Sequence, residues 1–211
     1  VTVNGSTAVT VTVGGVVEDS IVNIENIFGA AGNDSLTGDG LANRFDGFNG
    51  DDLLIGAGGN DVLVGGFGND TIRGGLGNDQ LIGDAGIDTA DFSDLTTKIT
   101  TTLRVGAVAT VYSNGVAQDT MIGFENLTGG SGDDELRGDE NANVLSGNGG
   151  KDTLIGEDGA DTLSGGTEND TLGGGTGNDI LSGDAGIDKL FGDDGDDNLS
   201  GGTENDELYG L

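Results

Sequence analysis

The sequence predicts an all-β fold in which one short strand-and-turn unit is stacked on itself many times. Over most of the chain an aspartate recurs every nine residues, an apolar side chain follows it by two residues, and a glycine precedes it by five. The unit Gly65-Gly66-Phe67-Gly68-Asn69-Asp70-Thr71-Ile72-Arg73 is typical. The 211 residues include 45 glycines and no proline. Because glycine at this frequency opposes helices, we expect strands and turns throughout.

A longer repeat of 100 residues divides the chain into two similar modules. Ile24-Glu25-Asn26-Ile27 matches Phe124-Glu125-Asn126-Leu127 at this offset. We expect each module to be a β-strand leader followed by a tract of nonapeptides, with the leader capping the first layer of its own core. The predicted segments are residues 1–28 (leader), 29–91 (repeats), 92–128 (second leader, an internal duplicate of 1–28) and 129–211 (repeats).

The leaders are predicted from alternation and turn residues. Val9-Thr10-Val11-Thr12-Val13 alternates as a strand does and is followed by a turn signal at Gly14-Gly15. In the second leader, Ile99-Thr100-Thr101-Thr102-Leu103 predicts a strand, and Ser113-Asn114-Gly115 predicts a turn between two strands. The first repeat tract should end near Ala90, because the next position in register is Thr97.

Charge and composition exclude several classes of function. The chain has 38 acidic and 7 basic residues, for a formal net charge of -31, and it has no histidine or cysteine. High charge with few aromatics is typical of disorder, but here the acids fall at one phase of a repeat, so a counter-ion is expected to order them. The scattered basic residues make no nucleic-acid surface. Without His or Cys there is no histidine-based triad and no preferred zinc ligand, so we expect no enzyme. No segment is apolar enough to span a membrane.

The glycine-and-aspartate turn suits calcium. Glycines allow positive φ and let backbone carbonyls turn inward, and the aspartate adds a carboxylate. Calcium takes six to eight oxygen ligands in flexible sites, whereas magnesium demands a tighter octahedron. The sequence therefore predicts several bound Ca²⁺ ions.

These motifs resemble the RTX, or hemolysin-type, calcium-binding nonapeptide repeat of large secreted bacterial proteins. The resemblance implies right-handed parallel β-rolls with two nonapeptides per coil, and calcium shared by turns on the same side, 18 residues apart. It implies up to about 12 ions. The implied ligands form four columns: Asp34, Asp52, Asp70 and Asp88; Asp61 and Asp79; Asp134, Asp152, Asp170, Asp188 and Asp206; Asp161, Asp179 and Asp197. Weaker candidates at the starts of columns are Asn43, Asn143, Glu25 and Glu125.

The resemblance also implies a function: a calcium-binding structural segment of a larger protein that passes a type I secretion channel unfolded and folds on Ca²⁺ outside the bacterial cell. One alternative is a subunit of a surface layer, adhesin stalk or extracellular filament, in which the chain would contact itself or neighbouring domains. A second is an accessory polysaccharide-binding module, against which the sparse basic residues argue.

Overall fold

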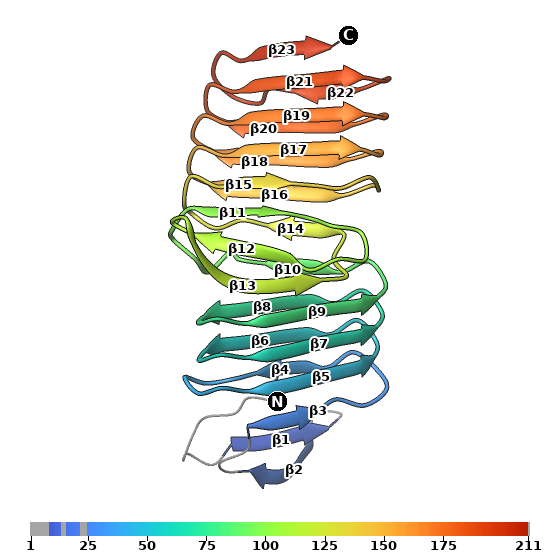
Figure 1. The fold of residues 1–211 in the computed structure, drawn as a ribbon, viewed down its shortest axis with the longest axis vertical. Coiled ribbons are helices and arrows are strands. Elements are labelled where there is room, and N and C mark those ends of the chain that lie inside the picture. Colours follow the sequence, from blue (N-terminus) through green and yellow to red (C-terminus); the bar gives the residue numbers. More distant parts are fainter. Residues whose placement is uncertain (1–8, 14–15, 22–24, 211) are drawn as a thin grey trace. The chain divides into compact units, whose positions relative to one another are not determined.

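The computed structural model describes residues 9–13, 16–21 and 25–210. This part of the chain consists of strands and turns and contains no helix (Figure 1). The all-β prediction is therefore confirmed. The turn expected at Gly14-Gly15 lies outside the described residues.

The chain forms two compact units that are not simply consecutive in sequence. Unit 1 comprises Val1–Ala90 together with Gln118–Gly123, and unit 2 comprises Asp91–Ala117 together with Phe124–Leu211. A short segment of the predicted second leader thus belongs to the unit that precedes it.

Unit 1 begins with an antiparallel pair, β1 (Val9–Val13) and β2 (Val16–Ile21). Its repeats then form two parallel layers. One layer contains β4 (Ser35–Thr37), β6 (Leu53–Gly58), β8 (Thr71–Leu76) and β10 (Thr89–Asp91). The other contains β3 (Asn26–Phe28), β5 (Arg44–Asn49), β7 (Val62–Phe67), β9 (Gln80–Ala85) and the described part of β13 (Val116–Ile122) that belongs to this unit.

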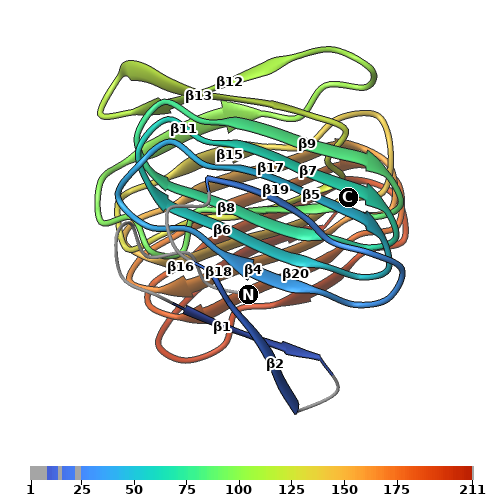
Figure 2. The same cartoon turned by 90° about the horizontal axis from the view of Figure 1, so that it is seen from below.

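Unit 2 repeats this plan. One layer contains β14 (Asn126–Thr128), β16 (Val144–Gly149), β18 (Thr162–Thr167), β20 (Ile180–Ala185) and β22 (Asn198–Ser200). The other contains β11 (Ile99–Thr102), β15 (Glu135–Arg137), β17 (Thr153–Asp158), β19 (Thr171–Thr176), β21 (Lys189–Asp194) and β23 (Glu207–Gly210). Strand β12 (Ala109–Ser113) is antiparallel to β11. Viewed end-on, β15, β17 and β19 lie in one layer and β16, β18 and β20 in the other (Figure 2).

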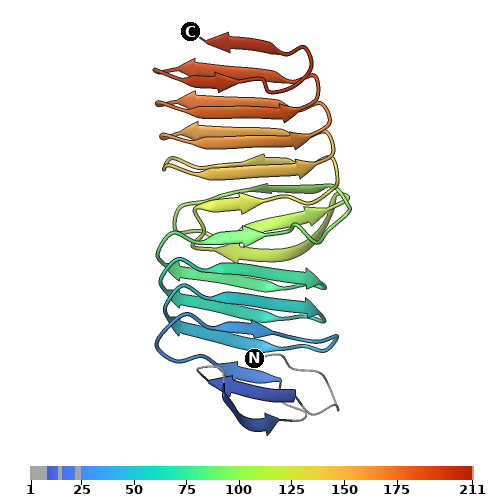
Figure 3. The same ribbon diagram turned by 180° about the vertical axis from the view of Figure 1, so that it is seen from behind.

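Strand register follows the nonapeptide period. Each strand pairs with the strand 18 residues away, so that Leu54 lies opposite Ile72 and Leu163 lies opposite Leu181. Consecutive nonapeptides therefore alternate between the two layers, and turns join them on both sides of each coil (Figure 3). This places aspartates 18 residues apart directly above one another. The parallel solenoid implied by the two-nonapeptide coil is confirmed.

The core of each unit is a single file of apolar side chains, one from each nonapeptide. The members are almost fully buried: Leu36, Phe45, Leu54, Leu63, Ile72 and Leu81 in unit 1, and Leu136, Leu145, Leu154, Leu163, Leu172, Leu181 and Leu190 in unit 2. Burying one such side chain contributes about 1.5–3 kcal/mol. One buried side chain per nine ordered residues is a thin core, so the turns must contribute to stability as well.

The second leader has the predicted hairpin. Asn114 and Gly115 join β12 to β13 with φ values of 49° and 77°. Asparagine and glycine tolerate this left-handed backbone, which two-residue hairpins require at both positions. The strand predicted at 99–103 is present as β11, and Leu103 directly after it is buried.

Candidate metal centres

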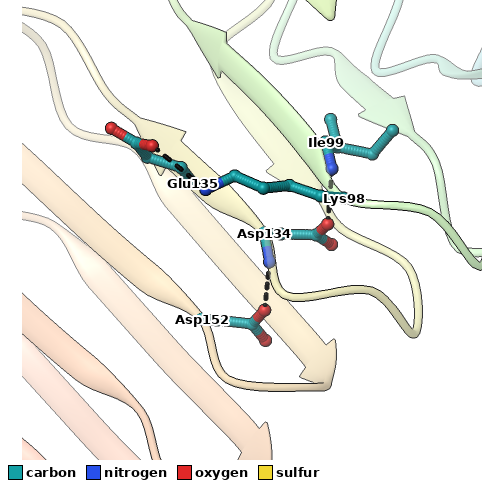
Figure 4. Close-up of polar contacts among 5 residues, drawn as sticks. All are labelled: Lys98, Ile99, Asp134, Glu135 and Asp152. Atoms are coloured by element: carbon teal, nitrogen blue, oxygen red, sulfur yellow. Dashed lines mark hydrogen bonds and ion pairs between the residues drawn. The ribbon is translucent and has the colours of Figure 1, made fainter. Parts of the chain in front are cut away.

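The aspartates at the nonapeptide phase form hydrogen-bonded ladders along both sides of each unit. The backbone N–H of Asp52 donates to Oδ1 of Asp70 over 2.8 Å, and the N–H of Asp152 donates to Oδ1 of Asp170 over 2.8 Å. The same bond, between residues 18 apart, joins Asp34 to Asp52, Asp70 to Asp88, Asn43 to Asp61, Asp61 to Asp79, Asp134 to Asp152, Asp170 to Asp188, Asp188 to Asp206, Asn143 to Asp161, Asp161 to Asp179, and Asp179 to Asp197. Figure 4 shows the start of one ladder, in which Ile99 donates to Asp134 and Asp134 donates to Asp152.

Each ladder aspartate ends a turn and precedes a strand, so its carboxylate lies inside the turn. Asp61, Asp70, Asp161 and Asp170 are each 1% exposed. The sequence-predicted columns are thus brought together as stacked, buried carboxylates, while Asp34, Asp197 and Asp206 are half-buried.

The second carboxylate oxygen, Oδ2, points into a cradle that lacks a side chain. A Cβ built on Gly47 would clash with Oδ2 of Asp52 and lie 2.7 Å from the carbonyl oxygen of Gly65. Carboxylate and carbonyl oxygens therefore converge beside a glycine that must have no Cβ. No hydrogen bond reaches this buried Oδ2 at Asp52, Asp61, Asp70, Asp152, Asp161, Asp170, Asp179, Asp188 or Asp197.

Backbone conformation explains why these oxygens receive no donor. In the interior turns, the residue four positions before the aspartate has positive φ, even where it is Phe48 (72°) or Glu157 (81°). In the first turns, the described residues at this position are outside the left-handed region, and their N–H groups donate to the side chain instead. These bonds are Ala30 to Asp34, Asp39 to Asn43, Gly130 to Asp134, and Asp139 to Asn143, at 2.7–3.1 Å.

A buried carboxylate oxygen without a donor needs a proton or a cation. Burial raises the pKa of Asp61 and Asp161 to about 6 and that of Asp152 and Asp170 to about 7, and neighbouring aspartates of the column raise it further, while the ladder hydrogen bond opposes both effects. At neutral pH a positive ion in the cradle would remove this penalty.

The oxygen set fits calcium. Among the described residues no three Asp, Glu, His or Cys side chains converge on one point. A cation in these turns would therefore draw ligands from backbone carbonyls as well as carboxylates, which calcium accepts readily.

The weaker candidates have different surroundings. Asn143 places Oδ1 near the N–H of Asp139 and donates from Nδ2 to the backbone oxygen of Glu125 over 2.8 Å. Glu25 is exposed, and its backbone oxygen accepts from the N–H of Arg44. Both asparagines are held by protein hydrogen bonds, whereas both glutamates are used here through their backbone.

One ladder residue escaped the sequence analysis. Asp119 is 2% exposed, and its Oδ1 accepts the N–H of Asp79 over 2.8 Å. Its separation from Asp79 is 40 residues, so no multiple of nine reveals it. The available signal was local: Asp119-Thr120-Met121-Ile122-Gly123 matches Asp79-Gln80-Leu81-Ile82-Gly83 in pattern.

Fold and turns together define a calcium-binding repeat protein built as a parallel β-solenoid. The family model of the RTX calcium-binding nonapeptide repeat matches residues 28–63, 55–90, 119–154, 137–172, 155–190 and 173–208, which together make up more than half of the chain. The chain belongs to this family, and the Ca²⁺ predicted from the sequence is confirmed as its ligand. No curated protein sequence matches the chain. The described residues contain no helix long and apolar enough to cross a membrane.

Proposed function

We propose that this chain is a structural module of a secreted bacterial protein and folds when it meets Ca²⁺ outside the cell. The observation that carries the proposal is the set of buried Oδ2 atoms that accept no hydrogen bond, repeated along each column. Export through a type I channel as an unfolded chain follows from the same chemistry, because a calcium-poor interior would leave the columns uncompensated.

Electrostatics gives the direction of this coupling. The net charge is -31, and each column stacks carboxylates that are removed from water. Desolvation and like-charge repulsion both disfavour the folded chain at neutral pH unless a cation is bound. A ligand that binds only the folded state stabilises it by mass action, so calcium binding and folding become one event.

The proposed ligands are the carboxylates of the ladder, with the interior turns as the primary sites. These are Asp52, Asp61, Asp70, Asp79, Asp88, Asp152, Asp161, Asp170, Asp179, Asp188 and Asp197. Asp34, Asp134 and Asp206 lie at the ends of columns and are proposed as contributors of lower weight.

The test is a calcium titration of the chain followed by size-exclusion chromatography with light scattering. The proposal expects the hydrodynamic radius to contract at about 10⁻⁴–10⁻³ M Ca²⁺ while the mass stays monomeric. The same concentration of Mg²⁺ is the matched control and should leave the radius expanded. A radius that does not respond to calcium would overturn the proposal.

A second candidate is a self-assembling layer, stalk or filament subunit. Large apolar side chains are exposed in unit 1, including Phe67 (68%), Leu76 (71%) and Ile87 (59%). Exposed apolar side chains of this size are typical of association surfaces. In the same titration this candidate predicts that the scattering mass rises with calcium, and that Phe67→Ser with Leu76→Ser abolishes the rise.

A further inference from the structure

The carboxylate ladder of unit 1 continues beyond the point where the nonapeptide register ends. The N–H of Asp79 donates to Oδ1 of Asp119, with the same length and direction as the bond from Asp61 to Asp79. Elsewhere the partner lies 18 residues ahead; here it lies 40 residues ahead. Asp119 therefore occupies the place of a repeat aspartate without belonging to a repeat tract.

The residues after Asp119 complete a coil. Thr120, Met121 and Ile122 of β13 pair in parallel with Gln80, Leu81 and Ile82 of β9. The N–H of Thr120 donates to the carbonyl oxygen of Asp79 over 2.9 Å, and Met121 is buried at the core position. This segment substitutes for the strand that Thr97 fails to begin.

The next residue completes a cradle. A Cβ built on Gly83 would clash with the carbonyl oxygen of Gly123 and lie 2.6 Å from Oδ2 of Asp88. At Gly47 the same two kinds of oxygen come from Asp52 and Gly65, thirteen residues later. At Gly83 the carbonyl comes instead from far along the chain, and Asp88 is fully buried.

We propose that Asp88 and the carbonyl of Gly123 form a calcium site that closes unit 1 with a segment from beyond residues 91–117. Asp119 is the positioning residue, because its ladder bond to Asp79 fixes the coil that carries Gly123. Calcium at this site orders residues 118–123 on unit 1, and unit 1 cannot complete its last site until they have returned. The inference rests on the proposed function, since it requires that these cradles bind calcium.

The experiment combines native mass spectrometry with hydrogen exchange on the full chain, in chelator and in saturating Ca²⁺. Wild type should show calcium-dependent protection at residues 118–123. Asp88→Asn should bind one calcium ion fewer and lose that protection. Asp94→Asn, which removes the same charge at an exposed site, should match wild type.

A second pair of variants leaves both proposed ligands intact. Asp119→Ala removes the acceptor for the N–H of Asp79 and should also bind one calcium ion fewer, whereas Asp119→Asn keeps an acceptor and should restore the count. A purely structural role for Asp119 would leave the calcium count of Asp119→Ala unchanged. This pair decides the question if Asp88→Asn fails to fold.

The outcomes separate this inference from the function on which it rests. If β7 and β17 gain protection with calcium but residues 118–123 do not, the closing site is overturned and the calcium-folding proposal stands. If no strand gains protection with calcium, the proposed function itself is overturned. An unchanged calcium count in both Asp88→Asn and Asp119→Ala would likewise overturn the closing site.

Discussion

Each interior aspartate divides its two oxygens between two tasks. In Asp179, Oδ1 accepts the N–H of Asp161, and Oδ2 lies in the cradle beside Gly174. The first bond fixes the spacing of coils, and charge-assisted bonds of this type contribute about 1.5–3 kcal/mol. The second oxygen is the proposed ligand. Structure and calcium binding can therefore be separated by substitutions beside the aspartate.

Two adjacent glycines provide such a separation. A Cβ at Gly174 would clash with Oδ2 of Asp179 and lie 2.8 Å from the carbonyl oxygen of Gly192, whereas a Cβ at Gly173 would meet nothing within 4 Å. We expect Gly174→Ala to fill one cradle, lose one bound calcium, and lower the free energy of unfolding by about 3 kcal/mol at calcium 100-fold above Kd. Gly173→Ala is the matched control. Calcium counts by native mass spectrometry that are equal for both variants would contradict this assignment.

The position four residues before the aspartate is equally sensitive. Gly175 has φ of 107°, and a Cβ there would clash with the carbonyl oxygen of Glu157. Gly175→Ala should therefore destabilise the calcium-bound chain, measured by denaturant unfolding, by about 1–3 kcal/mol. A loss as small as that of Gly173→Ala would show that the backbone here relaxes without cost.

At the scale of the element, first turns differ from interior turns. Asp134 has both carboxylate oxygens bonded to N–H groups, from Ile99 and Gly130, whereas Oδ2 of Asp152 has no donor. First turns can therefore form without a cation and offer each column a preformed end. This agrees in chemistry with Asn43 and Asn143, where a neutral amide stands in the same place.

Matched substitutions test this difference between turns. Asp152→Asn should remove one bound calcium and raise the calcium concentration needed for folding, because its cradle depends on a negative charge. Asp134→Asn should keep the wild-type calcium count, because an amide oxygen can accept the bond from Gly130. Native mass spectrometry of the two variants decides, and an equal loss from both would show that first turns also bind calcium.

Sequence and structure agree where one register governs both. The positions of Asp52 and Leu54 follow from the nine-residue period, because burial of one apolar residue fixes the phase of the turn before it. Asp119 could not be placed in this way, because the excursion before it breaks the period. The left-handed backbone at Phe48 and Glu157 was also hidden, since neither residue favours it; the stacked turns impose that conformation.

At the scale of the whole molecule, the raised pKa values make folding depend on pH. An aspartate whose folded-state pKa lies above its unfolded value of 3.8 stabilises the folded chain while protonated, and this stability is lost as pH rises through the folded pKa, about 6 for Asp61 and about 7 for Asp152. In calcium-free buffer we expect more β-structure at about pH 5.5 than at about pH 8. Circular dichroism across this range checks the sign, and a trend toward more β-structure at high pH would contradict it.

Calcium and protons should therefore compete for the columns. Binding of calcium releases protons from Asp152, Asp170 and their neighbours wherever these are protonated in the folded chain. The calcium concentration at half-binding should rise as pH falls from about 8 to about 6. Calorimetry in buffers of different ionisation enthalpy measures the released protons, and a binding heat independent of buffer at pH 6 would contradict the competition.

The central claim is that buried carboxylates along the coils require calcium at neutral pH. The most direct test is far-UV circular dichroism of the full chain at neutral pH, first in chelator and then in millimolar Ca²⁺. The account predicts a disordered spectrum in chelator and a cooperative change to β-structure on adding calcium, reversed when chelator is restored. A β-rich spectrum in chelator that calcium leaves unchanged would contradict it.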